Sequence, residues 1–175
     1  ARGHASPFGA QTAAVIATGY DGSNLSNVES YNGSAWSEVA EVNTPRREGS
    51  GFGTQTAGLI MAGRPPYTGA SESWNGSAWT EVGDLNTARA DTDARAGTST
   101  DGIYAGGYGP GTTTQGITEE WNGSAWSEVG DLNTARYYAG NSGTTSTSAL
   151  AVGGNPARDI VEAFNGTSWT EVADL

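Results

Sequence analysis

The segment WNGSAWTEVGDLNTAR at residues 74–89 returns almost unchanged as WNGSAWSEVGDLNTAR at residues 121–136. In both copies an Asn-Gly pair stands between two Trp residues, and Asn-Gly between aromatic, alternating segments is the strongest short signal for a β-hairpin. Weaker copies occupy residues 31–46 and 164–175. The chain therefore contains four repeats, each of which predicts a hairpin of two antiparallel strands.

Four residue types mark the repeat at regular distances. A Glu precedes a Trp by seven residues, the Trp precedes an Arg by ten, and a Gly follows each Arg by seventeen. The marker residues are Glu29, Glu72, Glu119 and Glu162, then Trp36, Trp79, Trp126 and Trp169, then Arg2, Arg46, Arg89 and Arg136, and then Gly19, Gly63, Gly106 and Gly153. Units of 43 to 47 residues that repeat in this way predict an array in which each unit packs on its neighbours.

Two further strands are predicted upstream of each hairpin. An apolar run that ends in Gly recurs at residues 13–19, 57–63, 101–107 and 148–154. A run without polar alternation is typical of a strand buried on both faces. The Gly-rich segment before it, SPFGAQT in the first repeat, indicates a strand that lies close to another backbone. No stretch has helical periodicity, so we expect an all-β protein with four antiparallel strands per repeat.

This repeat resembles the blade of a kelch-type β-propeller. The similarity rests on a Gly pair after the second strand, an aromatic residue ending the third strand, a Trp opening the fourth and a Thr-x-Arg after it. The Gly pair is Gly106 and Gly107 in the third repeat, and it is reduced to Gly19 and Tyr20 in the first and to Gly63 and Arg64 in the second. The resemblance implies a β-propeller of four kelch-like four-stranded antiparallel blades, at about residues 1–43, 44–86, 87–133 and 134–175.

Near-identical arrays of this kind are similar to those in bacteriophage structural and tail-associated proteins and in microbial surface proteins. That similarity implies a place on a virion surface or outside the cell. The repeated Trp residues are expected to pack between blades. Each repeated Arg is expected to hydrogen-bond main chain or the Glu of a neighbouring blade, as a buried pair that is costly to break. The Asn-Gly-Ser and Asn-Gly-Thr sequons coincide with the hairpin turns, so turn chemistry accounts for them.

Composition excludes several classes of function. The net charge of −11 and the absence of Lys argue against nucleic acid, because affinity for phosphate backbones depends on Lys and Arg. No apolar run reaches the roughly 18 residues of a membrane helix, so we expect no membrane insertion. With no Cys and with His4 as the sole His, we expect no metal and no cofactor. Asp91 and Asp93 form an Asp-x-Asp that could contact calcium, but one such tripeptide is better explained as a solvated loop.

Variation is concentrated in the connection between the second and third strands. These connections emerge on one face of a propeller, and loops on a rigid scaffold are common binding sites. They supply aromatic, amide and charged groups suited to sugars or protein surfaces. The candidate binding residues are Tyr20, Asp21, Asn24, Arg64, Tyr67, Tyr108, Asn155 and Arg158.

We therefore expect a non-enzymatic binding and structural module, whose partners are proteins of a particle or surface assembly. A propeller lectin with repeated glycan pockets is the alternative, and a glycoside-acting enzyme is less favoured. Joining EVADL at residues 171–175 to Ala1 would complete the repeat pattern if Asn and Thr were supplied. The ends are thus expected to meet within a four-bladed ring or through self-association with a second chain.

Overall fold

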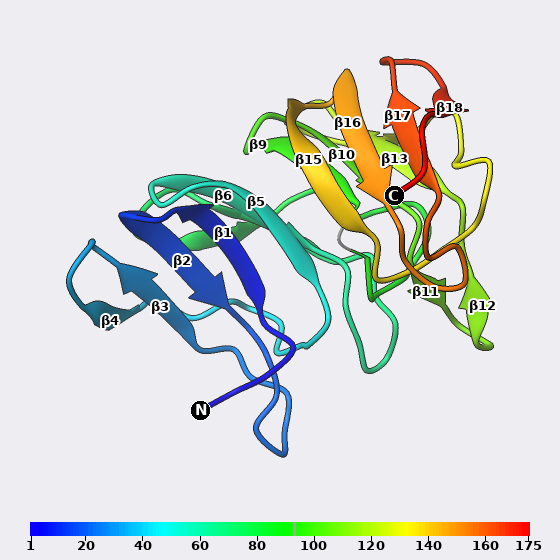
Figure 1. Ribbon diagram of the computed structural model, residues 1–175. Helices are drawn as coiled ribbons and strands as arrows, with labels where there is room; N and C mark the ends of the chain where they lie inside the picture. The colour runs from blue at the N-terminus through cyan, green and yellow to red at the C-terminus, as the bar shows by residue number, and fades with distance from the viewer. Residues whose placement is uncertain (93) are drawn as a thin grey trace.

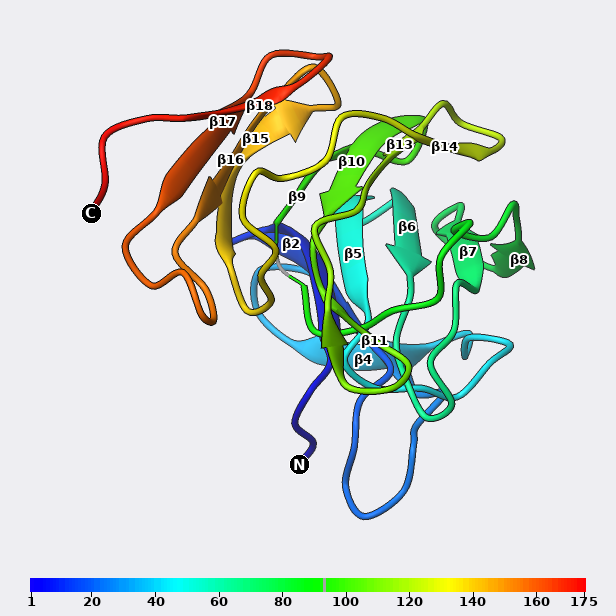
Figure 2. The same ribbon diagram turned by 90° about the vertical axis from the view of Figure 1, so that its right-hand side faces the viewer.

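The computed structural model describes residues 1–92 and 94–175, and it contains only strands, turns and loops in these ranges. Hydrogen bonds arrange the strands into four four-stranded antiparallel sheets, one per repeat (Figures 1 and 2). The first sheet contains β1 (Ser6–Ala10), β2 (Ala13–Ala17), β3 (Val28–Tyr31) and β4 (Trp36–Val39). The second contains β5 (Ser50–Thr54), β6 (Ala57–Met61), β7 (Ser71–Trp74) and β8 (Trp79–Glu81).

The third and fourth sheets follow the same order. The third contains β9 (Arg95–Thr98), β10 (Asp101–Ala105), β13 (Thr118–Trp121) and β14 (Trp126–Glu128). The fourth contains β15 (Gly140–Thr145), β16 (Ser148–Val152), β17 (Val161–Phe164) and β18 (Trp169–Glu171). The long loop of the third repeat adds a small hairpin of β11 (Tyr108–Gly109) and β12 (Thr113–Thr114), which the sequence did not predict. The all-β class and the four strands per repeat are thereby confirmed.

The Asn-Gly turns join the last two strands of every sheet. In the second sheet the side-chain oxygen of Asn75 accepts hydrogen bonds from the backbone N–H groups of Ser77 and Ala78, at 3.0 and 2.9 Å. Gly76 follows with a φ of 93°, a left-handed conformation that suits a residue without a Cβ. The three other repeats form the same side-chain turn at Asn32, Asn122 and Asn165.

Three hydrophobic clusters hold consecutive sheets together. The first cluster joins Phe8 and Val15 of the first sheet to Trp74 and Trp79 of the second. The second cluster joins the second sheet to the third around Trp121 and Trp126, and the third joins the third sheet to the fourth around Phe164 and Trp169. None of these clusters joins the first sheet to the fourth, and the two chain ends lie apart in both views (Figures 1 and 2).

The structure corrects the predicted glycine register. The backbone N–H groups of Gly19, Gly63 and Gly107 each donate 2.9 Å hydrogen bonds to the carbonyl of the next repeated Arg, so Gly107, and not Gly106, is equivalent to Gly19. The third repeat has an extra residue before its first strand, since Ala96 follows Arg89 by seven residues, whereas the equivalent Phe52 follows Arg46 by six. The fourth repeat has a bulge in its first strand, at Gly143–Thr145. The first position of the Gly pair is therefore Thr18, Ala62, Gly106 and Gly153, all with positive φ.

In the described part of the chain, no helix is long and apolar enough to cross a membrane.

Candidate functional site

Each repeated Arg was predicted to bond main chain or the Glu of a neighbouring blade. The main-chain bonds are present, as from Arg89 Nη2 to the Tyr104 carbonyl at 3.1 Å, but the Glu partner belongs to the same repeat. Arg46 Nη1 lies 2.8 Å from Glu72 Oε1, and both side chains are buried. Glu72 also accepts hydrogen bonds from the backbone N–H groups of Asn43 and Thr44. The same arrangement recurs at Arg89–Glu119 and Arg136–Glu162. These carboxylates are saturated by the chain that leads into their own sheet, so the pairs are structural.

Burial affects the arginines of these pairs. It lowers the pKa of Arg46 and of Arg136, and the paired carboxylates of Glu72 and Glu162 oppose that effect.

Two residues after each repeated Arg, the backbone adopts a left-handed conformation. The residues at this position are His4, Glu48, Asp91 and Tyr138, with φ values of 56°, 57°, 60° and 54°. Backbone hydrogen bonds of 2.9, 3.1 and 2.9 Å link them in series, from Glu48 to His4, from Asp91 to Glu48 and from Tyr138 to Asp91. Positive φ is uncommon for residues other than Gly and is often found at functional sites. We refer to these four residues as the polar cluster.

Side chains of the polar cluster line a cavity of about 130 Å³. His4 Nδ1 lies 3.4 Å from Glu48 Oε1, and Arg64 Nε donates to the other oxygen of Glu48. Arg64 Nη2 also lies 3.4 Å from Asp91 Oδ2. The Oδ1 atom of Asp91 is buried without a hydrogen-bond partner in the part of the chain that the structure describes. The cavity thus combines two nearly buried carboxylates, a guanidinium, an imidazole and a phenol.

Burial changes the proton affinity of two members of the polar cluster. It raises the pKa of Asp91, and the positive charge of Arg64 only partly offsets this. It also raises the pKa of Tyr138, and the negative charge of Asp91 acts in the same direction. Both groups therefore hold their protons more tightly than the free side chains do.

All four variable connections begin beside the polar cluster. In each repeat the residue after the Arg pairs by a β-bridge with the residue after the second Gly-pair position. These bridges are Gly3–Tyr20, Arg47–Arg64, Ala90–Tyr108 and Tyr137–Asn155. The first residue of each loop is therefore paired with the residue that directly precedes a member of the polar cluster.

Aromatic and cationic side chains surround the cluster. The guanidinium carbon of Arg47 lies 4.4 Å from the centre of the Tyr20 ring, and that of Arg64 lies 5.7 Å from the Tyr67 ring. The rings of Tyr108 and Tyr137 are 4.9 Å apart, as are those of Tyr137 and Tyr138. Three tyrosines and two Arg–Tyr pairs thus lie on one face.

The predicted site residues fall into two groups. Tyr20, Asn24, Arg64, Tyr67, Tyr108 and Asn155 come together around the polar cluster. Asn24 takes part through its side-chain oxygen, which accepts a 3.1 Å hydrogen bond from Arg47 Nη1. Asp21 and Arg158 are exposed, and Asp21 accepts hydrogen bonds from Ser23. The structure therefore gives neither of them a contact with the cluster among the described residues.

Sequence reasoning missed the polar cluster itself. The two residues after each Arg read Gly-His, Arg-Glu, Ala-Asp and Tyr-Tyr, so they differ although the preceding residues, NTPR at 43–46 and NTAR at 86–89 and 133–136, are nearly identical. That local variation was the available signal. The interpretation of Asp91 as part of a solvated loop is wrong, since its side chain is 3% exposed. Asp93, the other half of the Asp-x-Asp, lies outside the described residues.

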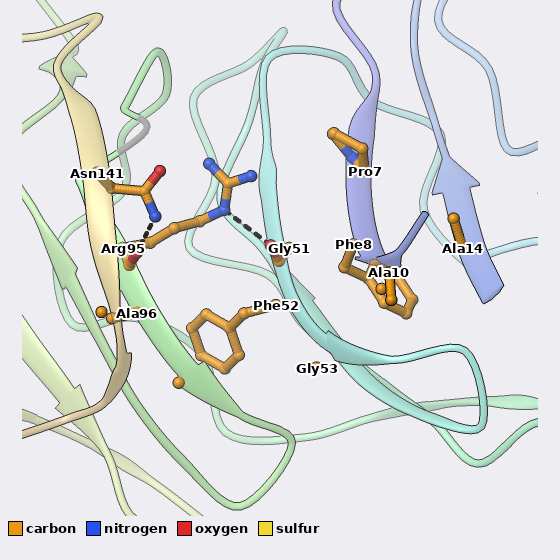
Figure 3. Close-up of a pocket in the computed structure, with 13 residues that line it drawn as sticks. Pro7, Phe8, Ala10, Ala14, Gly51, Phe52, Gly53, Arg95, Ala96 and Asn141 are labelled. Carbon is orange, nitrogen blue, oxygen red and sulfur yellow. Dashed lines mark hydrogen bonds between the residues drawn. The ribbon is translucent and has the colours of Figure 1, made fainter. Parts of the chain in front are cut away.

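A second cavity, of about 400 Å³, lies between the first strands of the four sheets (Figure 3). Gly and Ala residues form much of its wall, together with Phe8 and Phe52. The Arg95 side chain extends across it toward β5, where Nε donates a 2.7 Å hydrogen bond to the Gly51 carbonyl. Asn141 on β15 donates to the Arg95 carbonyl. No group of three or more His, Cys, Asp or Glu side chains suited to a metal ion occurs within residues 1–92 and 94–175.

No family model matches this chain, and no curated protein is significantly similar to it in sequence. The geometry of the polar cluster and its surrounding loops therefore carries the functional argument.

Proposed function

We propose that this chain is a non-enzymatic binding module of the kelch-like propeller type, which captures a protein partner on the face formed by the polar cluster and the variable loops. One observation carries the proposal: the four connections that differ most between repeats all begin at β-bridges next to His4, Glu48, Asp91 and Tyr138. The connections that vary most between repeats thus begin on the same surface as the polar cluster. The proposed location is a virion surface or the outside of a cell.

The composition of this face favours a protein partner. Tyr and Arg, with Trp, are enriched at the energetic centres of protein interfaces, and this face holds five tyrosines and two arginines. The arginines are already oriented by Glu48, Asp91 and the rings that they cover. Such preorganisation lowers the entropic cost of binding.

A glycan is the second candidate ligand. The supporting observation is the cavity of about 130 Å³, where the carboxylates of Glu48 and Asp91 lie beside the ring of Tyr138. Carboxylates accept hydrogen bonds from sugar hydroxyls, and an aromatic face can stack on the apolar side of a sugar ring.

A peptide selection tests the proposed function. The folded chain is used to select from a phage-displayed random peptide library, and the selected peptides are then measured against variants. Tyr138 is exposed, so Tyr138→Ala should leave the fold intact and weaken peptide binding at least tenfold. Ser127→Ala is the control, because Ser127 is exposed on β14 and lies outside the variable loops, and it should bind as the unchanged chain does.

Two other results distinguish the alternatives. Binding to a defined glycan array that is lost in Tyr138→Ala supports the lectin. Peptides and glycans that bind Tyr138→Ala and Tyr20→Ala at full strength contradict a site on this face.

A further inference from the structure

An apolar face of the first sheet lies uncovered. Trp36 is 50% exposed, whereas its equivalents Trp79, Trp126 and Trp169 are 8%, 5% and 5% exposed. Its indole N–H has no hydrogen-bond partner recorded among the described residues, while the other three donate at 3.0, 3.1 and 3.0 Å. Trp36 was expected to pack between blades, and it is the one repeated Trp that does not.

The fourth sheet has an uncovered apolar region at the matching position. Leu175 is 79% exposed and Val172 is 43% exposed. The residues equivalent to Leu175 in the earlier repeats are Val42, Leu85 and Leu132, and they are only 4%, 5% and 6% exposed. Each of these three is buried in a cluster that contains the Trp of the following sheet.

The three internal interfaces show what covers each kind of face. Val42 packs with Trp79, Leu85 with Trp126, and Leu132 with Trp169. A sheet therefore offers a Val or Leu to the sheet that follows it and a Trp to the sheet that precedes it. By this rule Leu175 of the fourth sheet and Trp36 of the first are two halves of one more interface of the same type.

Side-chain size supports this match. The Phe8 ring covers Gly58, where an added Cβ would lie 2.3 Å from the ring, and Phe52 covers Gly102 in the same way. In the third interface both of these positions are Ala, namely Ala96 and Ala149. The equivalent positions on the uncovered faces are Ser142 and Ala14. A small residue again stands opposite Ala, so the two faces fit without a clash or a large void.

The hydrogen-bond partner of the indole is also available. Trp79 donates to the Ala40 carbonyl, because the first sheet has Val28 where the second and third sheets have the acceptors Ser71 and Thr118. The fourth sheet has the same residue types as the first at these two positions, with Val161 in place of Val28 and Ala173 in place of Ala40. The Ala173 carbonyl can therefore accept from Trp36.

We propose that the fourth sheet of one copy of this chain packs on the first sheet of a second copy, in a head-to-tail contact that reproduces the internal interfaces. A second copy is the occupant because the three formed interfaces leave Trp36 and Leu175 of one chain exposed and apart. Such a contact joins two different surfaces, so it extends into closed rings or longer arrays. This inference is independent of the proposed binding function.

Sedimentation velocity on the chain at several concentrations, in about 150 mM NaCl to screen the net charge of −11, tests the proposal. Acrylamide quenching of fluorescence is measured in parallel. Trp36 is the only one of the six Trp residues that is exposed, so the difference between the chain and Trp36→Phe reports on this face. The proposal expects concentration-dependent dimers or larger species and a Trp36 signal that becomes shielded as they form.

Two variants make the test specific. Ser142→Phe places a large ring opposite Ala14 and should weaken association at least tenfold. Adding Ala14→Gly recreates the Phe-over-Gly pair of the first two interfaces and should restore association. Both positions lie at the uncovered faces, so the melting temperature of the monomer serves as the check on folding.

Three outcomes overturn the proposal. One is a monomer at every concentration with Trp36 quenched freely. The second is a monomer with Trp36 shielded, which indicates that the chain closes on itself. The third is association that Ser142→Phe leaves unchanged, which places the contact elsewhere.

Discussion

The Nη1 atom of Arg89 lies 2.5 Å from Oε1 of Glu119, and both side chains are completely buried. Glu119 also accepts from the backbone N–H groups of Asn86 and Thr87, at 2.7 and 3.2 Å, and from the Asn86 side chain. One carboxylate therefore fixes the chain segment that enters the third sheet. This pair belongs to the scaffold, and its equivalents hold the second and fourth sheets.

Removing the arginine should be costly. Arg89→Met leaves the Glu119 carboxylate buried without its counter-charge, so we expect a loss of about 3–5 kcal/mol in the free energy of unfolding. Urea denaturation followed by fluorescence measures it. Arg2→Met is the matched control: Glu29 is 42% exposed and stays hydrated, so the expected loss is about 1 kcal/mol. Equal losses in both variants would show that burial does not decide the strength of this pair.

The repeated tryptophans should differ by position. Trp126 packs against Phe52 and Tyr104 in the second cluster, so Trp126→Ala should cost about 3–5 kcal/mol of stability. Trp36→Ala, at the uncovered face, should cost less than about 1 kcal/mol when the chain is dilute enough to be monomeric. Unfolding midpoints of the two variants give the comparison. A Trp126→Ala chain that melts like the unchanged chain and loses only ligand binding would mean that this Trp is a binding residue.

The buried carboxyl of Asp91 should make stability depend on pH. Its pKa is raised in the folded chain, so the folded state holds the proton more tightly than the unfolded state. This tighter proton binding stabilises the folded chain fully below the unfolded pKa of about 3.9, and the stabilisation is lost as the pH rises through the folded pKa. Arg64, Tyr138, His4 and Arg47 are the charged or titratable groups that act on it.

Asp91→Asn removes this titration. We expect the stability of Asp91→Asn relative to the unchanged chain to increase between about pH 4 and pH 7. Thermal unfolding of both chains across this range tests it. A stability difference that stays constant with pH would contradict the burial of a titrating Asp91.

Loop exchange should separate scaffold from binding face. Residues 108–117 and 64–70 both connect the second Gly-pair position to the third core strand, so they can be exchanged in register. Replacing residues 108–117 by RPPYTGA removes the β11–β12 hairpin and Tyr108. The melting temperature should change by less than about 4 °C, the upper end of the shift that 1 kcal/mol produces in a domain of this size, while binding of the selected peptides is lost. A chain that fails to fold would show that the hairpin is part of the scaffold.

The sequence by itself determined the elements of this protein. Asn-Gly between Trp74 and Trp79, and its three equivalents, specified hairpins because the turn needs an amide side chain followed by a residue that tolerates positive φ. The Gly-terminated apolar runs specified the inner strands, and the period of 43 to 47 residues specified one sheet per repeat. The hairpin and strand signals are local, because they depend only on residues a few positions apart, and the repeat follows from comparing such segments along the chain.

Only the tertiary structure decided which residues meet. It paired Arg46 with Glu72 of its own repeat, since Glu72 on β7 lies beside the segment that leads into β5. It also brought His4, Glu48, Asp91 and Tyr138 together from four repeats, because the packing of one sheet on the next aligns equivalent backbone positions that are more than forty residues apart. Finally, Trp36 and Trp126 share a similar sequence environment, but Trp126 is buried because the second sheet packs on it, whereas Trp36 is 50% exposed.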